Sequence, residues 1–424
     1  MTHKRNHSAL LLLLAGLAVV AAPASADFRI QCPTGNNGSY ADNNGDGMIR
    51  AADGEIKKPL YPQQVCMHLG AGDGFAVMAD GHSQYTFGFS NLTGKPVDQT
   101  SAAGMLAAEI PAPTIALDEQ DRFYLTLSNV GMLMRPDLFD PHSVHWHGFP
   151  EAAPVFDGVP ESSITINMGS SLSYFYQVND AGTYMYHCHV EATEHMAMGM
   201  LGNLYVRPKQ NKLANGTVLA GGFVHQNGFK YAYNDGDGST RYDVEAPIQM
   251  TSFDGSFHDE HLAVQPLPFY LLRDDYPMLN GRGYPDTVNP AALAPSPDNP
   301  EGKVSQRVNA IVTATAGQKI LLRVSNLSVT KYFTLGTLGL RMKVIARDAR
   351  LLRGPDPDGT GPLLGKNLYY DTNSITLGGG ESTDVLVDTA GVAPGTYFLY
   401  TTNLNYLANG QEDLGGMLTE IRIQ

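Results

Sequence analysis

Residues 122–130 read Arg-Phe-Tyr-Leu-Thr-Leu-Ser-Asn-Val, and large apolar side chains at every second position alternate there with more polar ones. Successive side chains of a β-strand point to opposite faces, so this pattern predicts a strand with one buried face. Helical periodicity is scarce, and repeated short strands of this kind are typical of antiparallel β-sandwiches. Similar runs, rich in β-branched and aromatic residues and bounded by Gly, Pro, Asn or Asp, recur at residues 163–166, 172–178, 320–324, 342–346, 384–388 and 396–401.

The same pattern appears twice along the chain. Residues 117–129 and 315–326 each consist of a turn and a strand that ends in Ser-Asn, and Gly-Thr-Tyr at 182–184 recurs at 395–397. We therefore expect an all-β protein built from two copies of one sandwich. The expected division is a signal peptide at 1–26, an extension at 27–66, a first domain at 67–208, a Gly/Asn/Asp-rich linker at 209–245 and a second domain at 246–424.

The N-terminus has the pattern of a secretory signal peptide. Lys4 and Arg5 precede an apolar run at residues 9–20, and Ala24-Ser25-Ala26 forms a small-residue cleavage site. The apolar run is too short for a comfortable transmembrane span. We therefore expect export to the periplasm or out of the cell, without membrane insertion. The net charge of −14 disfavours nucleic acids and anionic membranes as partners.

The three cysteines fall into two groups. Cys32 and Cys66 lie early, and in an oxidising compartment they are the natural disulfide pair. Cys188 is then left reduced. A secreted protein tolerates such a thiolate best when a metal holds it.

Between the two early cysteines, residues 42–47 follow the calcium-loop pattern Asp-x-Asx-x-Asx-Gly. Gly47 stands at the sharp turn of such a loop. An Asn/Gly-rich surface turn with accidental acids is the alternative. A structural calcium ion would take its oxygen ligands from Asp42, Asn44, Asp46, the Met48 carbonyl and Asp53.

Two short segments concentrate the metal-binding chemistry. Residues 142–148 read His-Ser-Val-His-Trp-His-Gly, and residues 186–200 read Tyr-His-Cys-His-Val-Glu-Ala-Thr-Glu-His-Met-Ala-Met-Gly-Met. Together they hold six of the thirteen histidines. Two imidazoles, one thiolate and a weak axial thioether define a blue, type 1 copper site. On a strand His187 and His189 point to one side and Cys188 to the other, which places a thiolate site and an imidazole site back to back.

Both segments resemble the copper-binding motifs of multicopper oxidases, the cupredoxin-based family that includes laccases and, more distantly, copper nitrite reductases. The resemblance covers roughly residues 65–424 and implies two cupredoxin-like Greek-key sandwiches. The further matching motifs are Ile-Pro-Ala-Pro-Thr-Ile at 110–115, His-Gly-Phe-Pro at 147–150, Asp-Gly-Val-Pro at 157–160, Gly-Thr-Tyr at 182–184, Leu-Asn-Gly-Arg at 279–282, Asp-Val-Leu-Val at 384–387 and Gly-Gly-Met at 415–417.

The resemblance also implies a role for individual residues. Asp157 matches a carboxylate near the copper cluster and would relay protons. The type 1 ligands would be His142, Cys188, His195 and an axial methionine, namely Met200 with Met198 as the fallback. One half of a type 2/type 3 copper cluster would be His145, His147, His187 and His189.

The second half of the chain departs from the family pattern. A complete cluster in the resembled family takes four histidines from each of two domains, and this chain has no histidine after His261. Residues 334–339 read Thr-Leu-Gly-Thr-Leu-Gly where His-x-His is expected, and residues 400–404 read Tyr-Thr-Thr-Asn-Leu where His-Cys-His is expected. A homotrimer, common among the two-domain proteins that this chain resembles, would lack the same ligands in every copy.

The remaining histidines and methionines allow two interpretations each. His258 and His261 form either a substitute metal pair or part of a solvated strand edge. Methionines 196 and 198 either fill core gaps or bind Cu(I). The isolated histidines, expected to be surface or packed residues, are His68, His82 and His225.

The sequence thus favours an exported oxidoreductase that takes electrons one at a time from a reducing substrate at type 1 copper. A second copper site would receive them, with O₂ as the acceptor. Phenols, metal ions and redox proteins all stay open as the reducing partner. A non-enzymatic blue-copper carrier or copper-tolerance protein is the alternative, and nitrite reduction is a second one.

Overall fold

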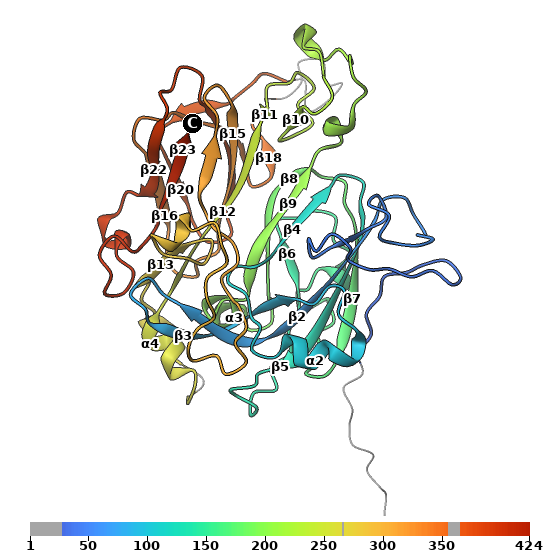
Figure 1. The fold of residues 1–424 in the computed structure, drawn as a ribbon, viewed down its shortest axis with the longest axis vertical. Helices are drawn as coiled ribbons and strands as arrows, with labels where there is room; N and C mark the ends of the chain where they lie inside the picture. Colours follow the sequence, from blue (N-terminus) through green and yellow to red (C-terminus); the bar gives the residue numbers. More distant parts are fainter. Residues whose placement is uncertain (1–27, 265–266, 355–364) are drawn as a thin grey trace, which may run out of the picture.

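The computed structural model describes residues 28–264, 267–354 and 365–424. The predicted signal peptide lies outside the described residues. Two β-sandwiches lie side by side, the first coloured blue to green and the second yellow to red (Figure 1). The all-β prediction is confirmed, because the described chain is mostly strand with a few short helices. Within the described part of the chain, no helix is long and apolar enough to cross a bilayer.

The first sandwich consists of two sheets. In one, β2 pairs in parallel with β5, and β5 pairs with β7 in the antiparallel sense. In the other, the strand order is β4-β9-β8-β6. The strands are β1 (Ile49–Arg50), β2 (Gln64–Val77), β3 (Ser83–Asn91), β4 (Ala112–Asp118), β5 (Arg122–Gly131), β6 (His145–His147), β7 (Ser171–Gln177), β8 (Gly182–His187) and β9 (Leu201–Arg207).

The second sandwich repeats this topology. Strand β12 pairs in parallel with β15, β15 pairs with β21, and the facing sheet has the order β14-β23-β22-β16-β20. Its strands are β12 (Val244–Phe253), β13 (Tyr276–Leu279), β14 (Val312–Ala314), β15 (Lys319–Asn326), β16 (Phe333–Thr337), β17 (Met342–Arg347), β18 (Arg350–Leu351), β19 (Tyr370–Thr372), β20 (Ser374–Leu377), β21 (Ser382–Asp388), β22 (Gly395–Thr401) and β23 (Leu418–Ile423).

The segment 209–243, which connects the two sandwiches along the chain, folds into two 3-10 turns and a small hairpin. The hairpin pairs β10 (Lys230–Tyr231) with β11 (Arg241–Tyr242). The helices of the protein are short. They are α2 (Thr100–Gly104), α3 (Ala192–Ala197), α4 (Gly255–Glu260) and the 3-10 turns η1 (Val97–Gln99), η2 (Pro154–Phe156), η3 (Lys209–Lys212), η4 (Ala220–Gly222), η5 (Phe269–Leu271), η6 (Asp286–Val288) and η7 (Leu404–Leu407).

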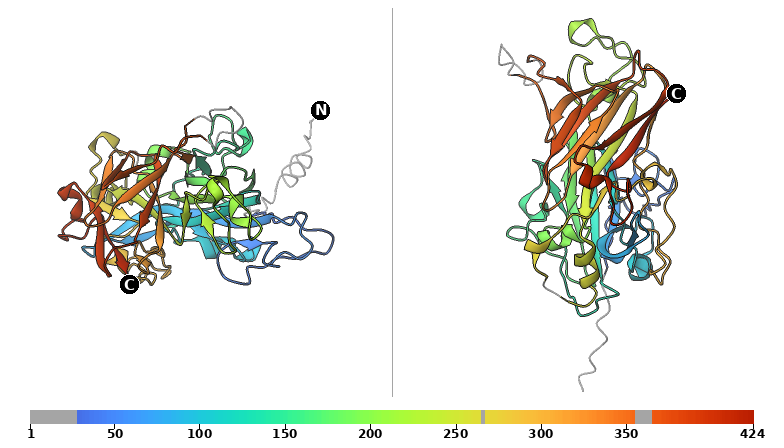
Figure 2. Two further views of the ribbon diagram at one scale, coloured as in Figure 1. Left: turned by 90° about the horizontal axis from the view of Figure 1, so that it is seen from above. Right: turned by 90° about the vertical axis from the view of Figure 1, so that its left-hand side faces the viewer.

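The N-terminal extension lies at the end of the molecule away from the second sandwich (Figure 2). The predicted disulfide between Cys32 and Cys66 is confirmed, with the two Cα atoms 5.6 Å apart. Strand β1 pairs with β2 so that Ile49 faces Cys66. The extension is thereby tied to the first sheet both covalently and by backbone hydrogen bonds.

One predicted strand, residues 163–166, is wrong. The backbone N–H groups of Ser162 and Ser163 both donate to the carbonyl of Val159, which makes a turn. Only Ile166 pairs with another segment, through two backbone hydrogen bonds with His142. The β-branched residues were therefore a weaker signal than the preceding Gly-Val-Pro turn.

The two sandwiches meet at a buried charged network. Arg323 of β15 is fully buried, and it contacts Glu245 at 2.8 Å and Asp384 at 3.4 Å. From the first sandwich, Arg207 reaches Glu245 at 2.8 Å and Thr183 donates to Asp384 at 2.5 Å. Buried charges need partners of this kind, because ions that lose water without a counter-charge are strongly destabilising.

Candidate metal centres

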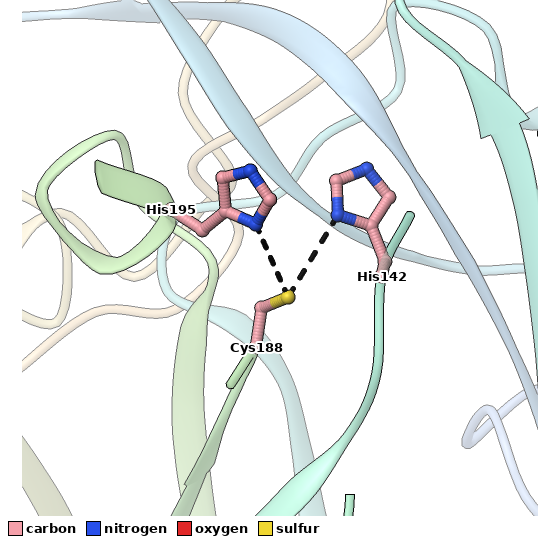
Figure 3. Close-up of side chains that lie close together, drawn as sticks. All are labelled: His142, Cys188 and His195. Atoms are coloured by element: carbon pink, nitrogen blue, oxygen red, sulfur yellow. Dashed lines mark hydrogen bonds between the residues drawn. The ribbon is translucent and has the colours of Figure 1, made fainter. Parts of the chain in front are cut away.

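Among the described residues, two groups of side chains bring metal-binding atoms together at the end of β8. The first group is His142, Cys188 and His195, all fully buried (Figure 3). The Cys188 Sγ atom lies 3.7 Å from His142 Nδ1 and 3.3 Å from His195 Nδ1. One sulfur and two imidazole nitrogens thus point toward one another, the donor set that suits copper.

Three separate segments position these side chains. His142 pairs with Ile166 just before β6, and Cys188 follows β8, where its N–H donates to the Met200 carbonyl at 3.1 Å. Helix α3 carries His195. The backbone hydrogen bond from Met200 to the His195 carbonyl closes the loop at 2.8 Å. Residues 188–200 therefore form a compact unit that supplies two of the three side chains.

The two imidazoles of this group have different electrostatic environments. Burial, followed by the charge of His195, holds the pKa of His142 well below its usual value. Burial alone would lower the pKa of His195, but the charge of Cys188 and contacts with Asp140 and Cys188 outweigh burial and raise it to about 10. Asp140 Oδ2 lies 3.8 Å from His195 Nε2. No motif marks this carboxylate in the sequence, and only its place two residues before His142 distinguishes it.

Two of the methionines that follow His195 are buried with this group. Met198 and Met200 are fully buried and belong to the same core cluster as Cys188. Met196 is only partly buried and lines the second group instead. Met200 stays the predicted axial residue, with Met198 as the fallback.

The second group comprises His145, His147 and His187, whose ligand atoms all lie within 4.8 Å of one another. His147 Nδ1 is 3.3 Å from His187 Nε2. The ring of His189 packs beside them, with its centroid 5.1 Å from that of His145. Strands β6 and β8 bring the group together, because His145 pairs directly with His187 in the sheet.

Backbone carbonyls orient two of these imidazoles. His145 Nδ1 donates to the Asp157 carbonyl at 2.6 Å, and His187 Nδ1 donates to the Cys188 carbonyl at 2.8 Å. Each ring therefore turns Nε2 toward the group, the arrangement by which outer hydrogen bonds orient metal-binding histidines. The Asp157 carboxylate also lies 3.4 Å from His145 Nδ1.

Protonation in this group also favours metal binding. Burial, the largest cause, lowers the pKa values of His145 and His147 and brings that of His187 to about 3. Neutral imidazoles have a free lone pair, which is the form that binds a metal. The residues of both groups thus fit copper in number and chemistry, and burial keeps the imidazoles of the second group in the form that binds a metal.

A cavity of about 540 Å³ contains the second group and reaches the second sandwich. Its remaining walls come from Ala192, Thr193, Met196, residues 327–332, Gly379 and Gly380. None of these residues from the second sandwich is a histidine or a cysteine. Gly380 has a φ of +89°, and a Cβ atom there would lie 2.8 Å from His147 Nε2. The second sandwich thus contacts the histidine group with backbone rather than with ligands.

The predicted calcium loop takes a different arrangement from the one expected. Asp42 accepts hydrogen bonds from the N–H groups of Gly45 and Gly47, and Asp46 accepts one from Met48. Asn44 similarly accepts from Asp46. Asp53 is exposed, and the buried carboxylate that reaches into the loop is Glu55, which accepts from residues 43, 44 and 50. Calcium binding stays a prediction.

The structure does not bring His258 and His261 together as a metal pair. His258 nitrogens contact the carbonyls of Tyr85 and Ala197, and His261 contacts Glu194. Both are buried in α4 and just after it, so the solvated strand edge is wrong. Among the isolated histidines, His68 contacts Ser128, His82 contacts Asp259 and His225 contacts Tyr231.

This chain is similar in sequence to proteins of a known family. Two profiles described as "Multicopper oxidase" match residues 90–211 and 273–416, more than half of the chain together. "Multicopper oxidase MCE" of Talaromyces pinophilus is 35% identical over 105 residues, which cover 24% of this chain and 16% of that protein. The match therefore spans about a sixth of that relative's length.

Solved structures share the fold across both sandwiches. A blue copper oxidase from Nitrosomonas europaea has a TM-score of 0.58 at 20% identity, covering 85% of this chain and 86% of that one. A copper nitrite reductase from Nitrosomonas europaea has a TM-score of 0.52 at 15% identity, covering 85% and 94%. With both halves matched by the family profiles and the cupredoxin-like sandwiches in place, this chain belongs to the multicopper oxidase family.

Proposed function

We propose that the protein is an exported copper-dependent oxidoreductase that oxidises a reducing substrate by one electron at a time and uses O₂ as the final acceptor. The observation that carries this proposal is the presence of two adjacent ligand groups joined by one tripeptide. His142, Cys188 and His195 would hold type 1 copper, and Met200 would supply a thioether. His145, His147, His187 and His189 would hold the second copper centre. Copper bound there would supply one-electron redox chemistry.

The tripeptide 187–189 supports electron transfer between the groups. Cys188 contributes its sulfur to the first group, while its carbonyl accepts the hydrogen bond that orients His187 of the second. The connection is therefore both covalent and hydrogen-bonded, without a solvent gap.

Asp157 is the proposed proton-handling residue. Its backbone carbonyl fixes His145, and its carboxylate lies on the same side, partly exposed. A carboxylate between a histidine group and solvent can take up and release protons as an acceptor is reduced.

A blue-copper electron carrier is the second candidate, favoured by the second sandwich's lack of ligands at the cavity. In that case His145, His147, His187 and His189 would hold one metal or none. The fold likeness to a nitrite reductase keeps reduction of nitrite as a further acceptor reaction to assay.

Copper content per chain, together with visible and EPR spectra, separates these functions. The protein without residues 1–26 is loaded with copper and compared with a His145→Ala/His187→Ala variant and with His225→Ala, a buried histidine outside both groups. If the protein is an oxidase, we expect an intense blue band and about two or more copper ions per chain. The double variant should lose the copper beyond the blue site, and His225→Ala should keep it. About one blue copper, unchanged in the double variant, would exclude the oxidase and leave the carrier.

The reducing partner is proposed to be a small molecule, a metal ion or a redox protein outside the cytoplasm. Calcium in the loop at residues 42–53 is proposed as a structural ion. Chelation of calcium should then lower the melting temperature of the extension and leave the blue band unchanged.

A further inference from the structure

We propose that His261, which follows helix α4 in the second sandwich, is a positioning residue for the type 1 ligand His195 and acts through Glu194. This inference rests on the proposed type 1 site. It gives the second sandwich, whose described residues at the histidine cavity include no histidine or cysteine, a defined role in the properties of the proposed copper site in the first.

Helix α3, which carries His195, needs support from outside itself. It has six residues and begins after Glu191, a residue with a φ of 44° in the left-handed region. A helix of this length is marginal on its own, because few hydrogen bonds repay the fixed backbone. The position of the His195 ring is therefore set by what contacts α3.

The side chain of His261 supplies one such contact. His261 Nε2 lies 3.1 Å from Oε1 of Glu194, the residue directly before His195. The other ring nitrogen, Nδ1, lies 2.9 Å from the Phe257 carbonyl, so that both nitrogens are engaged and the ring plane is fixed. His261 is fully buried and Glu194 nearly so, which makes the hydrogen bond strong and its loss costly.

The main chain of His261 is held as well. Arg135 donates to the His261 carbonyl and at the same time forms a two-pronged contact with Asp137, at 2.9 and 2.7 Å. Arg135 belongs to the segment that leads to His142. His261 therefore joins the two segments of the first sandwich that carry the type 1 histidines.

An aromatic ring completes the connection. Phe87 lies between the two histidines, with its ring centroid 5.9 Å from that of His195 and 5.8 Å from that of His261, edge-on to both. A displacement of His261 would thus reach His195 by packing as well as through Glu194.

The test measures the spectrum and midpoint potential of the copper-loaded protein. We compare His261→Leu, His261→Gln and Glu194→Gln with His225→Leu, which removes a buried histidine that lies outside both metal-binding groups and is hydrogen-bonded to Tyr231 at 2.9 Å. We expect His261→Leu to change the equilibrium constant for reduction about tenfold, equivalent to about 59 mV for one electron, and to alter the copper hyperfine coupling. His261→Gln, which can still donate to Glu194, should largely restore the wild-type values.

A double-variant cycle isolates the path through Glu194. If His261 acts through this residue, Glu194→Gln and His261→Leu shift the potential non-additively. Wild-type spectra and potentials in the His261 and Glu194 variants, with a loss of stability like that of His225→Leu, would overturn the inference. A wild-type protein without any blue band would instead overturn the proposed function, so the two failures are distinguishable.

Discussion

The ends of β8 and β22 occupy equivalent places in two copies of one topology, yet among the described residues only the end of β8 carries side-chain groups that could bind a metal. In the first sandwich His145 pairs with His187, and in the second Leu335 pairs with Thr401. The backbone pairing is the same, and the side chains differ. Metal chemistry in this fold therefore depends on the residues at strand ends and on the loops that follow them, not on the sheets themselves.

The loops after the two strands differ in the same sense. Helix α3 follows β8 and brings His195 back to Cys188, whereas η7 (Leu404–Leu407) follows β22 and carries no ligand type. The second sandwich instead lines part of the histidine cavity, and its residue His261 contacts Glu194 of α3. The first sandwich thus carries the side-chain groups that could bind a metal, and the second lines part of the cavity around the histidines.

The largest effect is expected when the residue that follows the equivalent strand is changed in each sandwich. Cys188→Ser should abolish the blue band completely, because a hydroxyl does not replace the thiolate. Thr402→Ser, at the equivalent place after β22, should leave copper content and spectrum unchanged. Visible absorption and metal analysis of the two purified variants decide this. A blue band in Cys188→Ser would contradict the assignment of the type 1 site.

The junction of the two copies should carry the next largest effect. Arg323→Leu leaves Asp384 buried without a guanidinium partner and Glu245 with Arg207 alone, and we expect a loss of about 3–5 kcal/mol in the free energy of unfolding. Arg341→Leu is the matched control, because Arg341 also lies 3.4 Å from a carboxylate, Asp371, but both side chains are exposed. Its expected loss is about 0–1 kcal/mol. Denaturant unfolding followed by fluorescence measures both, and equal losses would refute the role of burial.

The same junction should make stability depend on pH. Burial alone would raise the pKa of Glu245, but Arg323 and Arg207 outweigh burial and lower it to about 2. Because this folded-state value lies below the unfolded one, the stabilisation is fully present above about pH 4.5 and is lost as the pH falls toward about 2. Glu245→Gln should remove about 3 kcal/mol of this acid-sensitive stability. Unfolding midpoints recorded across that pH range test it, and an unchanged slope in the variant would contradict it.

The smallest expected effect concerns the wall that the second sandwich presents to His147. In Gly380→Ala the new Cβ would lie 2.8 Å from His147 Nε2, so the imidazole must shift, and we expect the affinity of the second group for copper to fall about tenfold. The blue band should persist. Gly391→Ala is the control, since its φ of +77° imposes similar backbone strain with nothing within 4 Å of the added Cβ. Copper titration of both variants measures the difference, and equal affinities would show that the wall is irrelevant.

Much of the fold followed from local pattern. The alternation in residues 122–130 corresponds to β5 (Arg122–Gly131), and the predicted repeat corresponds to equivalent strands of the two sandwiches. The disulfide also followed, because only two cysteines remained once Cys188 was set aside. Such features depend on neighbouring residues or on elimination, and a single sequence contains both.

The missed features depend on contacts between distant segments. Glu55 and Asp140 have no motif that distinguishes them, and their roles appear only when the chain brings them to the loop or to His195. His261 carried the right chemistry for a metal, but its partner Glu194 comes from the other sandwich. Gly380 contributes by having no side chain, which a search for ligand types cannot detect.

A hydrated copper ion cannot reach His142, Cys188 or His195 from solvent while the protein holds this conformation, since none of the three has exposed surface. Metal uptake must then wait for a local opening, whose frequency belongs to the protein and not to the ion. At rising copper concentration the rate of loading should level off at the opening rate. The finished site would release its ion equally slowly, so that the burial of three side chains sets the lifetime of the holoprotein in a copper-poor environment.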